Sequence, residues 1–271
     1  MRRREFVPAL AAGTALRAQA DESKEARAKR VIDEAIAALG GDKFMTMRDR
    51  TEHGRAYSFY RDRLSGLSRA TIYYRYVRRP DPLPAEPGLY VRERQSFGKD
   101  KEDYAIMFDG KDGWQITFRG VRPLPKATIE RWQDSTRRNI FYILRQRLGE
   151  PGLGYESKGG DVFENQSVEI VEFFDSENAS VTVYFSRTTK LPIRQLYYRR
   201  DAVVRERHEE VTLFSKYRDS GNGIMWPWAI MRTRDGEKVF EIFSDSVKIN
   251  QDLDDSKFTL PANLQVLPEG R

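Results

Sequence analysis

Most of this chain reads as β-strands, because apolar and polar residues alternate over short stretches that end in turn signals. Leu67–Val77 carries Ile72, Tyr74 and Tyr76 in one phase, and Tyr104–Phe108 repeats the pattern. The sequence DGKDG that follows is typical of a tight hairpin turn. Alternation of period two predicts strands with one buried face, and tight turns predict antiparallel neighbours.

The same pattern continues through the rest of the chain. Further strands are expected over Leu89–Phe97, Trp114–Phe118, Val168–Phe174, Ser180–Arg187, Ile193–Arg200, Val203–Tyr217, Met225–Thr233 and Val239–Ile249. A sheet this wide must curl or close, because twist accumulates from strand to strand. We therefore predict a mainly antiparallel β (α+β) fold. It is a strongly curved, half-open β-barrel of about ten to eleven strands, with helices covering the concave face.

Two segments have helical periodicity. Residues 23–39 place apolar side chains on one stripe, with Ser23 as N-cap and Gly40-Gly41 as the stop. Thr128–Leu148 is a second amphipathic stretch, predicted as one helix. Its apolar stripe is either part of an ordinary core or the inner face of a lid over the concave side of the sheet.

Two stretches lack periodicity and are predicted as connections. Pro80–Pro87 is rich in proline, which cannot join a sheet ladder, and Gly152–Gly160 is expected to be a mobile connector. Neither divides the chain into parts with different patterns. Residues 21–271 are therefore predicted to form a single domain.

The first twenty residues resemble an export signal peptide. A basic start is followed by a short apolar stretch and by Ala18-Gln19-Ala20, which predicts cleavage after Ala20. The pair Arg3-Arg4 also fits a twin-arginine signal, so both the Sec and the Tat route are open. We therefore expect a periplasmic protein.

Composition excludes several kinds of site. The chain has no cysteine and only His53 and His208, so we expect no cofactor, no metal site and no cysteine nucleophile. Neither a G-x-S-x-G elbow nor a phosphate-binding loop occurs, and we predict no enzyme activity and no catalytic residues.

Charge and hydropathy restrict the partners. Half of the net charge of +6 lies in residues 1–20, which hold four Arg and one Glu. The remaining charges are mixed along the chain, so nucleic acid is not an expected partner. No long apolar run follows residue 20, and we predict that the mature protein does not span a membrane.

Bulky apolar residues on the predicted strands and on the second helix form the candidate site. They either fill an ordinary core or line a cavity that shields an acyl chain, where each buried CH₂ contributes roughly 0.8 kcal/mol. The candidate lining residues are Tyr74, Trp114, Ile116, Phe118, Phe141, Leu144, Phe173, Phe185, Trp226, Trp228 and Ile230.

Several stretches resemble the LolA-like superfamily of periplasmic lipoprotein and lipid carriers, which includes mycobacterial lipid-binding lipoproteins. They are Arg27–Gly41, Asp109–Phe118, Thr188–Ile193, Tyr217–Ile230 and Val247–Pro261. The resemblance implies a half-open barrel with a helical lid, an apolar cavity and a periplasmic location. Unlike the lipid-anchored members, this chain has no cysteine, which implies free diffusion.

The leading hypothesis is a soluble, non-catalytic periplasmic carrier of a lipid acyl chain or of a lipoprotein lipid. The alternative is an envelope protein-interaction or stress-sensing module that binds a partner peptide on the same concave face. The two differ in what should co-purify with the protein, which is lipid in the first case and a defined protein in the second.

Overall fold

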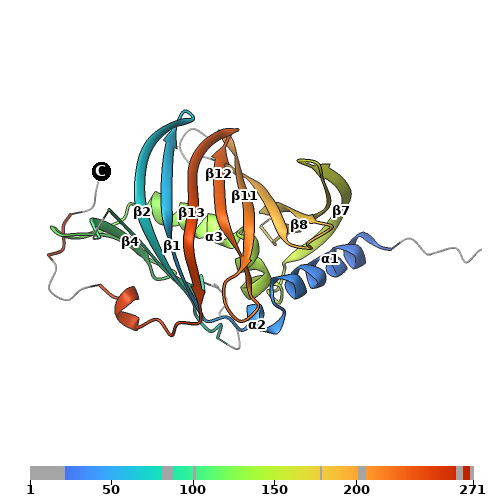
Figure 1. The fold of residues 1–271 in the computed structure, drawn as a ribbon, viewed down its shortest axis with the longest axis horizontal. Coiled ribbons are helices and arrows are strands. Elements are labelled where there is room, and N and C mark those ends of the chain that lie inside the picture. The colour runs from blue at the N-terminus through green and yellow to red at the C-terminus, as the bar shows by residue number, and fades with distance from the viewer. Residues whose placement is uncertain are drawn as a thin grey trace, which may run out of the picture.

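The computed structural model describes residues 22–80, 88–99, 102–177, 179–200, 206–260 and 265–268. Thirteen strands form one antiparallel sheet in the spatial order β6-β5-β4-β3-β2-β1-β13-β12-β11-β10-β9-β8-β7. The sheet is strongly curved, with a helix against its inner side (Figure 1). Strands β6 and β7 are its two edges, so the barrel is half open. The expected fold class is confirmed, with more strands than the ten or eleven predicted.

The chain builds the sheet as two meanders. The first comprises β1 (Asp49–Tyr60), β2 (Arg63–Tyr76), β3 (Val91–Gly98), β4 (Tyr104–Phe108), β5 (Gly113–Thr117) and β6 (Gly120–Pro123). The second comprises β7 (Gly154–Phe163), β8 (Gln166–Phe174), β9 (Ser180–Ser186), β10 (Pro192–Arg200), β11 (Arg207–Asp219), β12 (Met225–Arg234) and β13 (Glu237–Ile249). Pairing of β1 with β13 joins the two meanders at the centre.

One predicted connection is a strand. Gly152–Gly160 was expected to be mobile, but most of it belongs to the edge strand β7, which pairs with β8 along its length. The prediction was wrong because glycine is typical both of loops and of bulges. Here Gly159 has a φ of 92°, and the register shifts between Ser157 and Gly159.

The pairing register determines which side chains share a face. Tyr74 pairs directly with Arg50 on one side and with Glu93 on the other, so these three side chains lie on the same face. Tyr74 packs against the main hydrophobic core, which also contains residues of the helices. This face is therefore the concave one, and the core lies between it and the helices.

Helix α1 (Lys24–Leu39) covers the β7–β8 end of the sheet. The Ser23 hydroxyl accepts a hydrogen bond from the Ala26 amide, and Gly40 ends the helix with a φ of 127°, as the sequence predicted. The buried stripe of α1 includes Val31, Ile32 and Leu39. A short helix α2 (Asp42–Met45) follows and buries Phe44.

The second predicted helix is broken in the middle. Helix α3 (Lys126–Arg137) ends before Asn139, whose side-chain oxygen accepts hydrogen bonds from two amides of the next turn, α4 (Ile140–Tyr142). A π-helical turn, η1 (Ile143–Arg147), continues from α4. Asparagine favours helix caps over helix interiors, and this local capping explains the break.

The C-terminal segment lies on the convex face of the first meander. A short 3₁₀ turn, η2 (Asp255–Phe258), contacts β3, and Val266 forms an isolated bridge with Val121 of β6. Arg75 pairs with Asp255, which holds this turn against β2.

Residues 1–20, predicted as the signal peptide, lie outside the described residues. So do residues 81–87 of the predicted proline-rich loop and residues 203–205, the start of the strand predicted over Val203–Tyr217. Among the helices of the described part, none has both the length and the apolar character needed to cross a membrane.

Candidate functional site

The concave face is occupied by a short segment of the chain, residues 139–148, which we call the plug. Five consecutive plug side chains are fully or almost fully buried; they belong to Ile140, Phe141, Tyr142, Ile143 and Leu144. Such a continuous apolar stretch is unusual in this highly charged sequence. It fills the interior, which is the core alternative of the two left open by the sequence, whereas the family resemblance implied an apolar cavity.

A few hydrogen bonds anchor the plug to its surroundings. The Ile140 amide donates to Oε1 of Gln195 on β10 at 2.9 Å, and the Tyr90 amide donates to the Tyr142 hydroxyl at 3.1 Å. The Arg145 guanidinium donates to the carbonyl oxygens of Met45, the last residue of α2, and of Met47. The plug is therefore held mainly by side chains, which can reorient without breaking the sheet.

Phe141 of the plug packs against two aromatic rings of the sheet. Its ring centre lies 4.6 Å from that of Trp226 on β12 and 5.1 Å from that of Phe214 on β11. Its exposed fraction is 3%, which makes it a core residue in this state. Removal of Phe141 from this position would expose a cluster of aromatic faces to the interior.

A buried ion pair, Arg50 with Glu52, lies next to the Trp226 ring on the concave face. The guanidinium of Arg50 is close to the ring faces of Tyr74 and Trp226, and its Nε lies 3.5 Å from a carboxylate oxygen of Glu52. Glu52 is 1% exposed and accepts a hydrogen bond from the Ser244 hydroxyl. A buried ion pair of this kind is costly to desolvate, so it is weak support for stability alone.

Several polar groups around the plug have no hydrogen-bond partner among the described residues. They include Nε of Arg145, Nε1 of Trp226 and the Tyr90 hydroxyl, while Nε of Arg50 has only its ion pair with Glu52. Each unsatisfied buried donor costs about 1–3 kcal/mol. These donors lie around the plug. The protein with the plug in place is therefore less stable than it would be if every buried donor had a partner.

The structure separates the predicted lining residues into two groups. Most pack into or against the core on the concave side: Tyr74, Phe141, Leu144, Phe173, Phe185, Trp226, Trp228 and Ile230. Trp114 and Ile116 belong to a separate cluster on the convex face, because Trp114 shares the register of Tyr73 rather than Tyr74. Phe118 lies after β5, at a hairpin turn, and is 85% exposed.

Next to the region covered by the plug, an apolar strip runs along the concave face across β1, β2, β3, β12 and β13. The strip consists of buried Ala56, Ala70 and Ile242 with partly buried Ile72, Phe97, Ile230 and Phe240. Because its larger side chains are only partly buried, this strip offers apolar surface outside the plugged region.

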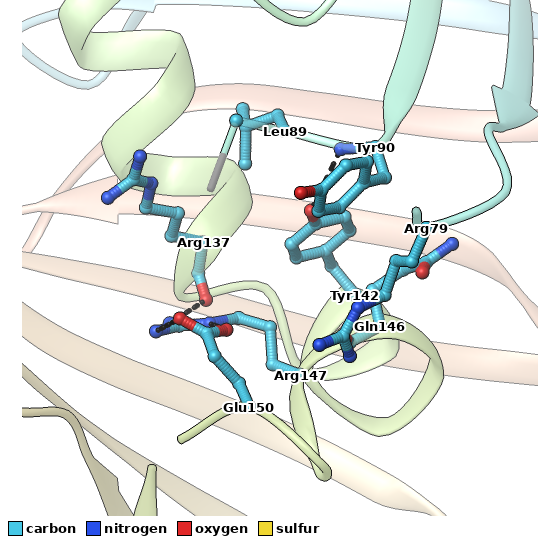
Figure 2. Close-up of a pocket in the computed structure, with 9 residues that line it drawn as sticks. Arg79, Leu89, Tyr90, Arg137, Tyr142, Gln146, Arg147 and Glu150 are labelled. Atoms are coloured by element: carbon cyan, nitrogen blue, oxygen red, sulfur yellow. Dashed lines mark hydrogen bonds and ion pairs between the residues drawn. The ribbon is translucent and has the colours of Figure 1, made fainter. Parts of the chain in front are cut away.

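A small polar pocket lies on the outer side of the plug (Figure 2). It has a volume of about 20 Å³, which holds one water molecule at most. Arg147 lies between Glu150 at 2.6 Å and the backbone carbonyl of Arg137 at 2.9 Å. Burial raises the pKa of Tyr142, at the wall of this pocket, to about 12. The pocket is too small for an organic ligand.

A second, open depression lies at the β4–β6 edge. Its volume is about 370 Å³, and its lining residues are Asp103, Tyr104, Gln115, Thr117, Phe118, Arg119, Gly120, Arg122 and Leu267. Tyr104 stacks on Phe97 with ring centres 5.0 Å apart, so this depression adjoins the apolar strip.

Sequence reasoning missed the charged and polar residues of the interior, above all Arg50, Glu52, Arg145 and Gln195. Arg50 and Glu52 lie in the phase of β1 that faces inward, where the apolar pattern predicts hydrophobic residues. The charged residues at inward-facing positions of β1 could have indicated a polar interior. The sequence alone does not show which positions face inward, because β1 has charged residues at both alternating sets of positions. No group of metal-ligating side chains with suitable proximity occurs in the described ranges.

Comparison with known proteins shows the fold. A DUF1329 family protein from Desulfovibrio piger ATCC 29098 matches with a TM-score of 0.59 at 14% identity, over 86% of this chain and 97% of that chain. A putative outer membrane lipoprotein-sorting protein domain from Vibrio parahaemolyticus matches with a TM-score of 0.54 at 12% identity, with the same coverage. A LolA superfamily protein from Nitrosomonas europaea gives 0.52 at 12% identity, again over 86% and 97%.

These likenesses show that the chain has the LolA-like half-barrel fold, as its sequence motifs implied. No protein-family model matches the sequence. No curated protein matches it either.

Proposed function

We propose that this protein is a non-catalytic periplasmic carrier that shields the acyl chain of a lipid or lipoprotein on the concave face of its half-barrel. The acyl chain takes the place of the plug, which moves aside when the ligand enters. The proposal is supported most directly by the plug itself, a continuous apolar segment that covers aromatic side chains and unsatisfied donors. The fold shared with a putative lipoprotein-sorting domain agrees with it.

The energetics of such an exchange are nearly balanced. Burial of five large plug side chains contributes about 1.5–3 kcal/mol each, and burial of an acyl chain contributes about 0.8 kcal/mol per CH₂. A tail of roughly 10–20 CH₂ groups would therefore replace what the displaced plug loses. A carrier needs such a balance, because it must release its ligand as well as bind it.

A set of mainly side-chain contacts must break or rearrange for the plug to move. The hydrogen bonds to the rest of the chain run through Gln195, Tyr142, Arg145, Gln146 and Arg147, and Arg147 also forms an ion pair with Asp175. Asn139 and the π-helical turn mark where the segment departs from regular helix, and both are sites at which a helix bends easily. The segment can thus swing as a unit from the end of α3.

The test uses the purified full-length chain. Lipid that co-purifies is extracted and identified by mass spectrometry, and the delipidated protein is titrated with a fluorescent fatty-acyl probe. We expect saturable binding and a change in tryptophan fluorescence, because Trp226 and Trp228 belong to or pack against the concave core. The Leu67→Ala variant, altered at an exposed position on the opposite face of the sheet, is the matched control and should bind equally well.

Absence of both co-purified lipid and probe binding would overturn the carrier proposal. Recovery of one defined protein partner without lipid would instead support a peptide-binding module of the cell envelope. Fractionation of cells that produce the protein tests the proposed location, with the periplasmic fraction as the expected one.

A further inference from the structure

A cluster of arginine side chains lies on the concave face next to the apolar strip. Arg199 on β10 and Arg234 on β12 both reach the carboxylate of Glu210 on β11, at 3.3 and 2.8 Å. Both contacts use the same oxygen, Oε1. Arg232 lies on the same face, because it pairs directly with Thr212 as Arg234 pairs with Glu210.

The cluster holds more positive than negative charge. Glu210 is shared by two guanidinium groups, and Arg232 forms no ion pair among the described residues. Glu237 pairs directly with Arg234 in the β12–β13 register but forms no ion pair with it, and Asp235, in the turn between these strands, hydrogen bonds to His208 at 2.7 Å. Among the described residues, only the carboxylate of Glu210 forms ion pairs with these three arginines, which leaves capacity for a further anion.

Two donors in this region have no hydrogen-bond partner in the part of the chain that the structure describes. One is Nε of Arg199, whose side chain is only 14% exposed. Nε of Arg138, at the end of α3, is also unsatisfied, and its guanidinium lies 5.1 Å from the Tyr197 ring centre. Tyr197 pairs directly with Glu210, so these donors converge on one part of the sheet. Unsatisfied guanidinium donors are suited to an oxyanion with several acceptor oxygens.

The cluster is continuous with the apolar strip. Arg232 pairs directly with Phe240, and its guanidinium lies 5.7 Å from the Phe240 ring centre. Two residues earlier on the same strand, Ile230 pairs with Ile242 inside the strip. A charged surface and an apolar surface thus meet within one repeat of the strand, about 7 Å.

We propose that this arginine cluster binds the phosphate group of an anionic amphiphile whose tail lies along the apolar strip towards the plug. This inference rests on the proposed function and adds the chemical class of the ligand. Guanidinium groups bind phosphate oxygens in pairs, and Arg199, Arg232 and Arg234 supply such groups from adjacent strands.

The test compares two soluble probes with the same fluorescent acyl chain, one with a phosphate head and one with a neutral hydroxyl head. The double variant Arg199→Gln/Arg232→Gln should weaken binding of the phosphate probe about tenfold or more and leave the neutral probe unchanged. The matched control is Arg55→Gln/Arg69→Gln, which removes two exposed charges from the opposite face, where these residues pair with each other. The control should bind both probes like the unaltered protein.

A second variant guards against misfolding. Arg232→Gln alone removes an exposed side chain without an ion pair in the described ranges, so the fold should be unaffected. It should weaken the phosphate probe selectively, by several fold. Inorganic phosphate is added as a competitor. If inorganic phosphate displaces the phosphate probe at a concentration equal to that of the probe, the anion site is supported and its ligand is free phosphate. If displacement needs a large excess of inorganic phosphate, the amphiphile is supported as the ligand.

Equal binding of both probes to the cluster variants and the unaltered protein would overturn this inference and leave the carrier proposal intact. Failure of both probes to bind the unaltered protein would overturn the carrier proposal itself.

Discussion

The guanidinium carbon of Arg50 lies 4.1 Å from the centre of the Trp226 ring, beneath the plug and beside Glu52. This contact joins β1 to β12 across the concave face, although β13 lies between them. It places a permanent positive charge against an aromatic face in the middle of an apolar interior.

Arg50→Met should destabilise the protein by about 3–5 kcal/mol, because it leaves the buried Glu52 carboxylate without its counter-charge. Chemical denaturation monitored by tryptophan fluorescence measures the effect. The double variant Arg50→Met/Glu52→Leu should recover much of the loss, since both charges are then removed. Equal instability of the single and double variants would contradict the proposed dependence of Glu52 on Arg50.

Phe141→Ala and Phe118→Ala should differ sharply, although the sequence pattern placed both residues in one cavity lining. Phe141 is buried against two rings, and its loss should cost about 3–5 kcal/mol. Phe118 is exposed, and its loss should change stability by less than about 0.5 kcal/mol. The free energy of unfolding measures both.

The cavity left by Phe141→Ala supplies an independent readout. It should bind a small apolar probe, so the unfolding temperature should rise with probe concentration, roughly as its logarithm above the Kd. Absence of any probe effect would indicate that the surrounding rings collapse into the space.

Gln195→Leu should loosen the plug, because the Ile140 amide loses its acceptor in a buried environment. We expect faster hydrogen exchange of amides in residues 139–148, and a several-fold gain in affinity for the fatty-acyl probe. The gain follows because apparent affinity rises with the fraction of protein in the open state. Gln195→Glu keeps an acceptor oxygen and is the matched variant. Faster hydrogen exchange of the plug amides without a gain in affinity for the fatty-acyl probe would contradict the prediction, because opening of the plug would then not admit the ligand.

Alkaline pH should destabilise the fold through buried tyrosines. Burial raises the pKa of Tyr142 to about 12, and burial also raises the pKa of Tyr74, Tyr76 and Tyr217. A phenol ionises near pH 10 in the unfolded chain. The raised folded-state pKa therefore contributes stability that is complete below pH about 10 and is lost as the pH rises towards 12.

Denaturation measured across this window should show a falling free energy of unfolding. Tyr142→Phe should reduce the slope, because it removes one of the shifted groups. A flat profile between these pH values would contradict the burial of these hydroxyls.

Local patterns in the sequence predicted the secondary structure well. Helix α1 depends on its own apolar stripe, on Ser23 and on Gly40, all of which act within a few residues. The strands follow from period-two alternation, and their tight turns set antiparallel pairing. Strands β1, β6 and β7 were not among the predicted segments, and the glycines of β7 made it resemble a loop.

The contents of the concave face depended on tertiary structure. Whether Phe141 lines a hollow or fills it depends on how far the sheet curls around the plug, and no local pattern encodes that curvature. Trp114 and Trp226 have similar alternating surroundings, yet the register of β3–β5 turns Trp114 to the convex side. Arg50 meets Trp226, and Arg199 meets Arg234 through Glu210, only because antiparallel pairing brings distant strands together. The sequence alone determined the strands, because alternation and turn residues act over a few positions. Only the tertiary structure determined the composition of the site, because burial and charge contacts join residues from distant strands of the folded sheet.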